Sequence, residues 1–240
     1  MHFLSFDQDW APDWALNDIL ERLEEVGLGG TVFITHDSPL LERMKSKANI
    51  ELGWHPNFLP GSSHGESIEE VLNVMASLVP EAVGARAHTL MRGTPILEAY
   101  KARGLRYDAA DIFDGQPSLS CFRSWTGLTR IPIYFEDDVH LHRGLPLSLE
   151  PLHMNSPGLK VFTFHPVLVA LNCSRLSSYE ALKVDLGKRG VPLTEASRQD
   201  FQAHIQRDEA GVGDLFQSVV TWLSERPGAG RHTLASLIDD

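Results

Sequence analysis

Two aspartates stand two residues apart, directly after the first apolar segment of the chain. The stretch "FLSFDQDW" contains Asp7 and Asp9, with Gln8 between them. One carboxylate can bind a divalent metal ion, and a second one beside it can take a proton from a metal-bound water. The pair therefore predicts a hydrolytic metal site in which one acid is a ligand and the other is the general base.

Further polar side chains follow the other apolar segments of the chain. They are His55, Asn57, His64, Arg86, His88, Asp137, Asp138 and His165. Active sites of α/β proteins lie at the carboxyl ends of the parallel strands, so we expect these side chains to converge. Imidazole and carboxylate together form the ligand set preferred by borderline divalent metals, and we expect zinc.

The segments that must position these residues alternate between strand and helix patterns. Strands are expected over residues 2–6, 31–35, 50–54, 83–85, 105–107, 128–135 and 159–164, with helices over 12–26, 38–45, 67–75 and 94–103. Ser67 and Glu70 form a capping box at the start of the third helix. Such alternation indicates right-handed βαβ units and a parallel sheet, either open or closed into a barrel.

Composition limits the function classes. The chain has 240 residues without an obvious linker, so we expect one domain over 1–240, mainly helical from about residue 175. The net charge of −11 argues against nucleic acid and against an anionic membrane surface. No apolar run reaches the roughly 20 residues of a membrane span, and the first residues lack a secretory signal pattern. We therefore expect a cytoplasmic protein; nothing in the sequence indicates its oligomeric state.

The motifs around the aspartates resemble those of the polysaccharide deacetylases of carbohydrate esterase family four, and more narrowly a subgroup associated with surface-polysaccharide gene clusters. That family has a Thr-Phe-Asp-Asp run after its first strand. The stretch "SFDQD" is similar to it, which implies Asp7 as general base and Asp9 as metal ligand. The family's second motif, His-x-x-x-His, is matched by His55 alone, because Leu59 stands four residues later. His64 is the substitute we expect for the second histidine.

Two more motifs extend the resemblance to about residue 166. Arg86 in "ARAH" matches the arginine that holds the base, and His165 in "VFTFHP" matches the histidine that protonates the leaving amine. Family members fold as a distorted (β/α) barrel with seven or eight mostly parallel strands, so the resemblance implies that fold class here.

The resemblance implies a metal-dependent N-deacylase, in particular a deacetylase, acting on an amino sugar or a polysaccharide precursor. Zinc would be held by Asp9, His55 and His64, and would lower the pKa of a bound water toward about 7. The oxyanion would be stabilised by the metal and by a backbone N–H near Trp10.

Several residues near these motifs have two interpretations. His88 is either a third ligand or a substrate contact. Trp10 and Trp54 either stack on a sugar ring or pack in the core. Asn57, Asp137 and Asp138 are candidates for lining the substrate. His140 and His142 in "EDDVHLH" would face one side of an extended strand, which makes them a competing metal pair.

Two other functions stay open. The missing second histidine of the His-x-x-x-His motif is compatible with a non-catalytic carbohydrate-binding relative. A metal-dependent hydrolase of a non-sugar amide is the other alternative, although the first strand lacks the His-x-His of the amidohydrolase superfamily.

Overall fold

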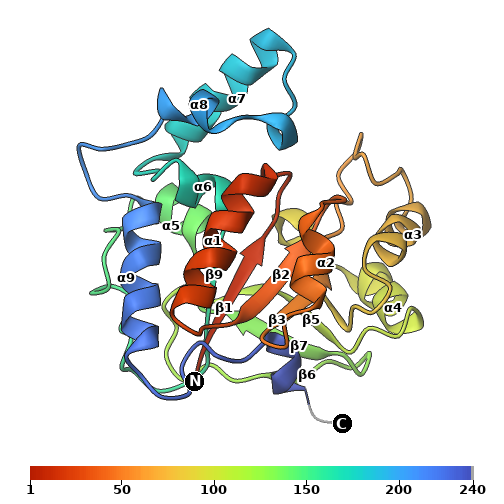
Figure 1. The fold of residues 1–240 in the computed structure, drawn as a ribbon. Helices are drawn as coiled ribbons and strands as arrows, with labels where there is room; N and C mark the ends of the chain where they lie inside the picture. Colours follow the sequence, from red (N-terminus) through yellow and green to blue (C-terminus); the bar gives the residue numbers. More distant parts are fainter. Residues whose placement is uncertain (239–240) are drawn as a thin grey trace.

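A central sheet of mostly parallel strands is covered by helices in the computed structural model, which describes residues 1–238 (Figure 1). Its strands are β1 (His2–Asp7), β2 (Gly30–Ile34), β3 (Ile50–Trp54), β4 (Gly84–Ala85), β5 (Tyr107–Ile112), β6 (Phe122–Arg123), β7 (Thr129–Ile133), β8 (Phe135–Glu136) and β9 (Lys160–Phe164). All five residues of β2 and of β9 are buried. Strands covered on both faces by other elements consist of such continuous apolar runs.

The strand order is β6-β7-β5-β4-β3-β2-β1-β9-β8, and β6 alone is antiparallel to its neighbour among the described strands. The two ends of the parallel sheet meet on one extended segment, residues 129–136. Its first part, β7, pairs with β5, and its last part, β8, pairs with β9. Between them, Tyr134 donates its N–H to Val161 O at 3.0 Å. The predicted α/β fold of mostly parallel strands is therefore confirmed, and residues 129–136 link the two ends of an open strand order.

The helices lie outside the sheet (Figure 1). They are α1 (Asp13–Glu25), α2 (Leu40–Lys45), α3 (Ile68–Leu78), α4 (Thr94–Ala102), α5 (Asp137–His142), α6 (Pro166–Ala170), α7 (Leu176–Arg189), α8 (Arg198–Gln202) and α9 (Val212–Ser224), with 3₁₀ turns η1 (His88–Leu90), η2 (Leu193–Glu195) and η3 (Leu234–Leu237). The predicted capping box begins α3, with Ser67 Oγ accepting from the N–H of Glu70 at 3.2 Å. Within residues 1–238 no helix has the length and apolar character needed to span a membrane.

Two expected elements differ from the structure. The fifth strand begins at Tyr107 and continues to Ile112, whereas the sequence pattern ended it at residue 107. Acidic residues are more typical of loops than of buried strands. Here the strand can continue because Arg130 of β7 forms ion pairs with Asp108 and Asp111. The segment "DDVHLH" forms helix α5 and no strand.

The histidines of α5 therefore do not form the competing metal pair. His140 Nε2 hydrogen-bonds the carbonyl oxygen of Pro146 at 3.0 Å, and His142 is exposed. In a helix, residues two apart point in different directions, so the two rings cannot share an ion as they could on a strand.

The buried carboxyl of Asp108 makes stability depend on pH. Burial raises its pKa to about 6 even though Arg130 opposes the shift. A folded-state pKa above the unfolded value of about 3.9 gives stability that is complete below about pH 4 and lost as the pH rises through about 6. We expect Asp108→Asn to gain stability relative to wild type between pH 4 and 7, measured by urea unfolding across that range. If the free energies of unfolding of the two proteins changed with pH in parallel, the raised pKa of Asp108 would be contradicted.

Candidate active site

Three side chains from different elements meet at the carboxyl ends of the strands. Asp9 follows β1, His55 follows β3, and His88 begins η1. The Oδ1 atom of Asp9 lies 2.9 Å from His55 Nε2 and 2.9 Å from His88 Nδ1. One carboxylate oxygen and two imidazole nitrogens thus converge in a group that could hold a metal ion.

A tight turn after β1 directs Asp7 and Asp9 into the same site. Gln8 between them is buried, and its Oε1 accepts hydrogen bonds from the N–H groups of Thr35 and His36 at 2.9 and 3.2 Å. Asp9 then has a φ of 44°, a left-handed conformation that is uncommon for a non-glycine residue and concentrates at functional sites. Gln8 therefore ties the turn to the end of β2. No motif in the sequence indicated this role of Gln8.

His64 is placed outside this group. Its Nδ1 accepts the N–H of Asn57 at 3.0 Å, and its Nε2 donates to the carbonyl oxygen of Thr35 at 2.7 Å. A neutral imidazole has one donor and one acceptor, so both are used and no lone pair is left for a metal. Asn57 in turn accepts the N–H of Leu59 through its side-chain oxygen. His64 and Asn57 thus organise the loop after β3, and the third member of the group is His88.

Asp7 lies beside the group and is held by Arg86. Both side chains are buried, and Arg86 Nη1 donates to Asp7 Oδ1 at 2.8 Å. The guanidinium also donates to Ser5 Oγ and to the carbonyl oxygen of Ala109. A buried charge pair with these extra hydrogen bonds fixes the direction of the carboxylate. Asp7 Oδ2 remains directed toward the site, 4.0 Å from His55 Nε2.

On the opposite side, His165 follows β9 and is held by Asp137 of α5. His165 Nδ1 lies 2.6 Å from Asp137 Oδ1, and the backbone N–H of His165 donates to Asp137 Oδ2 at 2.8 Å. Burial opposes a charge on this imidazole, but Asp137, with help from Asp138 and Asp9, raises the pKa of His165 well above its usual value. Its Nε2 lies 3.5 Å from Asp9 Oδ2, so a protonated ring presents an acidic N–H to the site.

The electrostatics of the three-residue group follow from the same contacts. Burial alone would raise the pKa of Asp9, but the charge and hydrogen bond of His55, then His88 and His165, hold it well below its usual value. Burial also works against charge on His88, and its hydrogen bond to Asp9 nevertheless raises the pKa of that imidazole. An ionised carboxylate at the centre of three imidazoles is an environment suited to a cation.

The tryptophans next to these residues differ in position. The Trp10 ring lies 5.3 Å from that of His88, at the edge of the site. Trp54 is buried in the core, and its indole N–H donates to Val79 O. The backbone N–H of Trp10 donates to Thr35 Oγ1 at 3.2 Å.

A pocket of about 220 Å³ opens beside His165. Its lining is Gln8, Asp9 and His165 from the strand ends and Asp138 of α5, with Val167 and Leu168 of α6 and Leu176, Tyr179 and Glu180 of α7. The first turns of α7 therefore form one wall of the site. Sequence patterns predicted this region only as mainly helical and gave it no role in the site.

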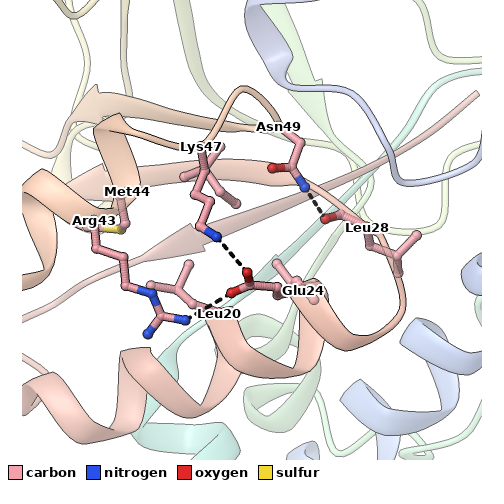
Figure 2. A pocket seen from close by; sticks show the side chains of 9 residues that line it. Leu20, Glu24, Leu28, Arg43, Met44, Lys47 and Asn49 are labelled. Atoms are coloured by element: carbon pink, nitrogen blue, oxygen red, sulfur yellow. Dashed lines mark hydrogen bonds and ion pairs between the residues drawn. The ribbon is translucent and has the colours of Figure 1, made fainter.

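Another pocket, of about 130 Å³, lies near the amino ends of β2 and β3, away from the site (Figure 2). Leu20 and Met44 contribute apolar side chains to it. Its charged groups pair with one another, because Glu24 bonds both Arg43 and Lys47. These charges are already satisfied, so we place the chemistry at the strand ends.

Comparison with known proteins shows the family of the chain. Residues 4–183 match the family model described as WbmS-like polysaccharide deacetylase. The structure of WbmS from Bordetella bronchiseptica, described as a polysaccharide deacetylase involved in O-antigen biosynthesis, is 31% identical with a TM-score of 0.78. That match covers 92% of this chain and 89% of the other. A search of curated proteins found no significant match.

A more distant structure shares the fold alone. The Bc1960 peptidoglycan N-acetylglucosamine deacetylase is 14% identical with a TM-score of 0.50, over 98% of this chain and 86% of that one. The family match places the chain among the polysaccharide deacetylases, and its fold agrees with that class. Within that class it belongs to the WbmS-like family, as the sequence resemblance implied.

Proposed function

We propose that this protein is a metal-dependent N-deacylase that removes an acyl group, in particular acetyl, from an amino sugar of a polysaccharide precursor. One observation carries the proposal. The group Asp9, His55 and His88 lies between a carboxylate fixed by Arg86 and an imidazole fixed by Asp137. A ligand group flanked by a base and an acid is the arrangement that hydrolysis of an amide needs.

The residues present fit a divalent metal. Both ring nitrogens of His55 are buried and have no hydrogen-bond partner within residues 1–238, although Nε2 faces Asp9 Oδ1. Buried polar atoms normally have partners, and a bound cation would supply one. We propose Asp9, His55 and His88 as the ligands and zinc as the ion, which when bound would polarise the acyl carbonyl and acidify a water.

Asp7 and His165 transfer protons as the general base and the general acid. Asp7 takes a proton from the attacking water through Oδ2, while Arg86 holds Oδ1. His165 donates the proton on Nε2 to the departing amine, since Asp137 holds Nδ1 and favours the imidazolium. Trp10, Asp138 and the α6–α7 wall of the pocket are positioned to contact the substrate.

The substrate class rests on the relatives. WbmS is described as involved in O-antigen biosynthesis, so an N-acylated sugar intermediate of a surface polysaccharide is the substrate we propose for this chain as well.

The test is activity with controlled metal content. Protein stripped by a chelator and reloaded with zinc is incubated with N-acetylated amino sugars, and released acetate and new primary amine are measured. We expect equal amounts of both, loss of turnover in the stripped protein, and recovery with zinc. A thermal shift with sugar but no product, at full zinc content, would instead support a non-catalytic carbohydrate-binding protein.

A further inference from the structure

Asp9, the central residue of the proposed metal site, lies in a strained turn. Asp9 and Trp10 have φ angles of 44° and 54°, both in the left-handed region. Two consecutive left-handed residues without a glycine are unfavourable, above all where the side chain is as bulky as that of Trp10. Such a conformation persists only where the surrounding contacts hold it. The contacts that hold this turn therefore decide where the carboxylate of Asp9 points.

Both chain neighbours of Asp9 are bonded to one residue, Thr35, which follows β2. The N–H of Trp10 donates to Thr35 Oγ1 at 3.2 Å, and the N–H of Thr35 donates to Gln8 Oε1 at 2.9 Å. The Thr35 hydroxyl has one hydrogen, which can go to Gln8 Oε1 at 3.3 Å or to His36 Nδ1 at 3.0 Å. Asp9 is thus held on both sides by contacts to the same residue.

Thr35 is itself fixed in place. It is 1% exposed and directly follows β2, which is buried along its length and pairs with β1 and β3. Its carbonyl oxygen accepts a hydrogen bond from His64 Nε2 at 2.7 Å. Because Thr35 is part of the rigid end of the sheet, its contacts give the turn after β1 a fixed position relative to the other strand ends.

Packing alone does not explain the hydroxyl of Thr35. Valine differs from threonine mainly by a methyl group in place of the hydroxyl, and both residues are common in strands. Burial of a hydroxyl is unfavourable unless the group is hydrogen-bonded. What the hydroxyl adds at this position is the hydrogen bond that it accepts from the N–H of Trp10, at the residue that follows Asp9.

We propose that Thr35 is a positioning residue for the metal site. Its hydroxyl keeps Trp10, and with it Asp9, in the left-handed turn. That turn places Asp9 Oδ1 2.9 Å from one ring nitrogen each of His55 and His88. Without the hydroxyl the strained turn relaxes, and the carboxylate moves away from the two imidazoles. The inference rests on the role of Asp9 as a metal ligand in the function proposed above.

The deciding experiment measures the zinc affinity of Thr35→Val by competition with a chromogenic chelator. We expect affinity to fall about 10- to 100-fold, the usual effect of removing a group that orients a metal ligand. Thr35→Ser keeps the hydroxyl and should bind zinc as tightly as wild type. In protein loaded with Co²⁺, whose visible spectrum depends on ligand geometry, Thr35→Val should change the spectrum and Thr35→Ser should not. A merely structural role would lower stability and leave the affinity and spectrum of the folded protein unchanged.

Thr31→Val is the matched control, because Thr31 is a buried threonine at the opposite end of β2. Its hydroxyl donates to Glu51 Oε2 at 2.7 Å and accepts the N–H of Leu234 at 2.9 Å. Thr31→Val should therefore lose stability, measured by urea unfolding, and keep its zinc affinity. If Thr35→Val does not fold, Thr35→Ala removes the same hydroxyl without placing a methyl group at its position, and the same loss of affinity is expected.

The outcomes separate the positioning role from the metal site itself. Zinc binding by Thr35→Val as tight as by wild type overturns the positioning role and leaves the metal site standing. Equal weakening in Thr35→Val and Thr35→Ser, or in Thr35→Val and Thr31→Val, also overturns it, because neither pattern depends on the hydroxyl of Thr35. A wild type that binds no zinc overturns the metal site, and the positioning role with it.

Discussion

His88→Ala is expected to purify without stoichiometric metal, whereas His64→Gln is expected to retain it. His88 Nδ1 lies 2.9 Å from the central oxygen of Asp9, and its loss leaves two ligands for a site that needs at least three from the protein. His64 instead bonds Asn57 and Thr35 through its two nitrogens. Its replacement should therefore cost about 1–3 kcal/mol of folding stability and little of the metal affinity.

The measurement is zinc per chain after equilibration with a slight excess of zinc and removal of unbound ion, combined with urea unfolding. Asp9→Asn serves as the positive control for metal loss. Metal retained in His88→Ala but lost in His64→Gln would assign the third ligand to the loop after β3, as expected from the sequence.

The second large effect concerns His165. We expect His165→Ala to keep its zinc and to lose 10²- to 10⁴-fold in kcat, roughly the contribution of a general acid. The raised pKa of His165 means that its protonated form persists to higher pH than that of an ordinary histidine, so the alkaline limb of the wild-type rate profile should lie above the usual histidine range. The variant should lose that limb. Steady-state kinetics across pH, with metal analysis of each sample, measure both effects.

His140→Gln is the matched control for a buried histidine of the same region. Its ring bonds Pro146 O and does not face the site, so the variant should keep its activity even if stability falls. If His165→Ala loses its zinc, the residue is a ligand and the acid must be sought elsewhere.

The sequence predicted the parts of the fold that depend on local pattern. Period-two and buried runs placed β1, β2, β3 and β9, and the Ser67–Glu70 capping box placed the start of α3. The same patterns put polar residues at strand ends, which was enough to predict that Asp9, His55 and His165 lie together. These predictions succeeded because a strand that is buried on both faces consists mainly of apolar residues, a pattern that is visible in the sequence.

The rest depended on contacts between distant residues. Strand β5 carries acids whose charge is neutralised by Arg130 of β7, which no local pattern reveals. His88 replaces His64 as the proposed third metal ligand for the same reason. Both histidines lie within reach of strand ends, and only the hydrogen bonds of the loop after β3 show that the nitrogens of His64 are occupied.

The division of the site between distant parts of the chain has a consequence for biogenesis. The base and the three residues proposed to bind metal lie between residues 7 and 88, on β1 to η1, while the acid follows β9, which pairs with β1 through Ser5 and Thr163. Contacts between residues so far apart in sequence form late in folding. A ribosome-bound chain that has exposed only its first hundred residues already carries the metal-binding half of the centre. On the assignment proposed above, the acid joins this half only when β9 enters the sheet, so we expect a chain that stops before β9 to lack catalytic activity.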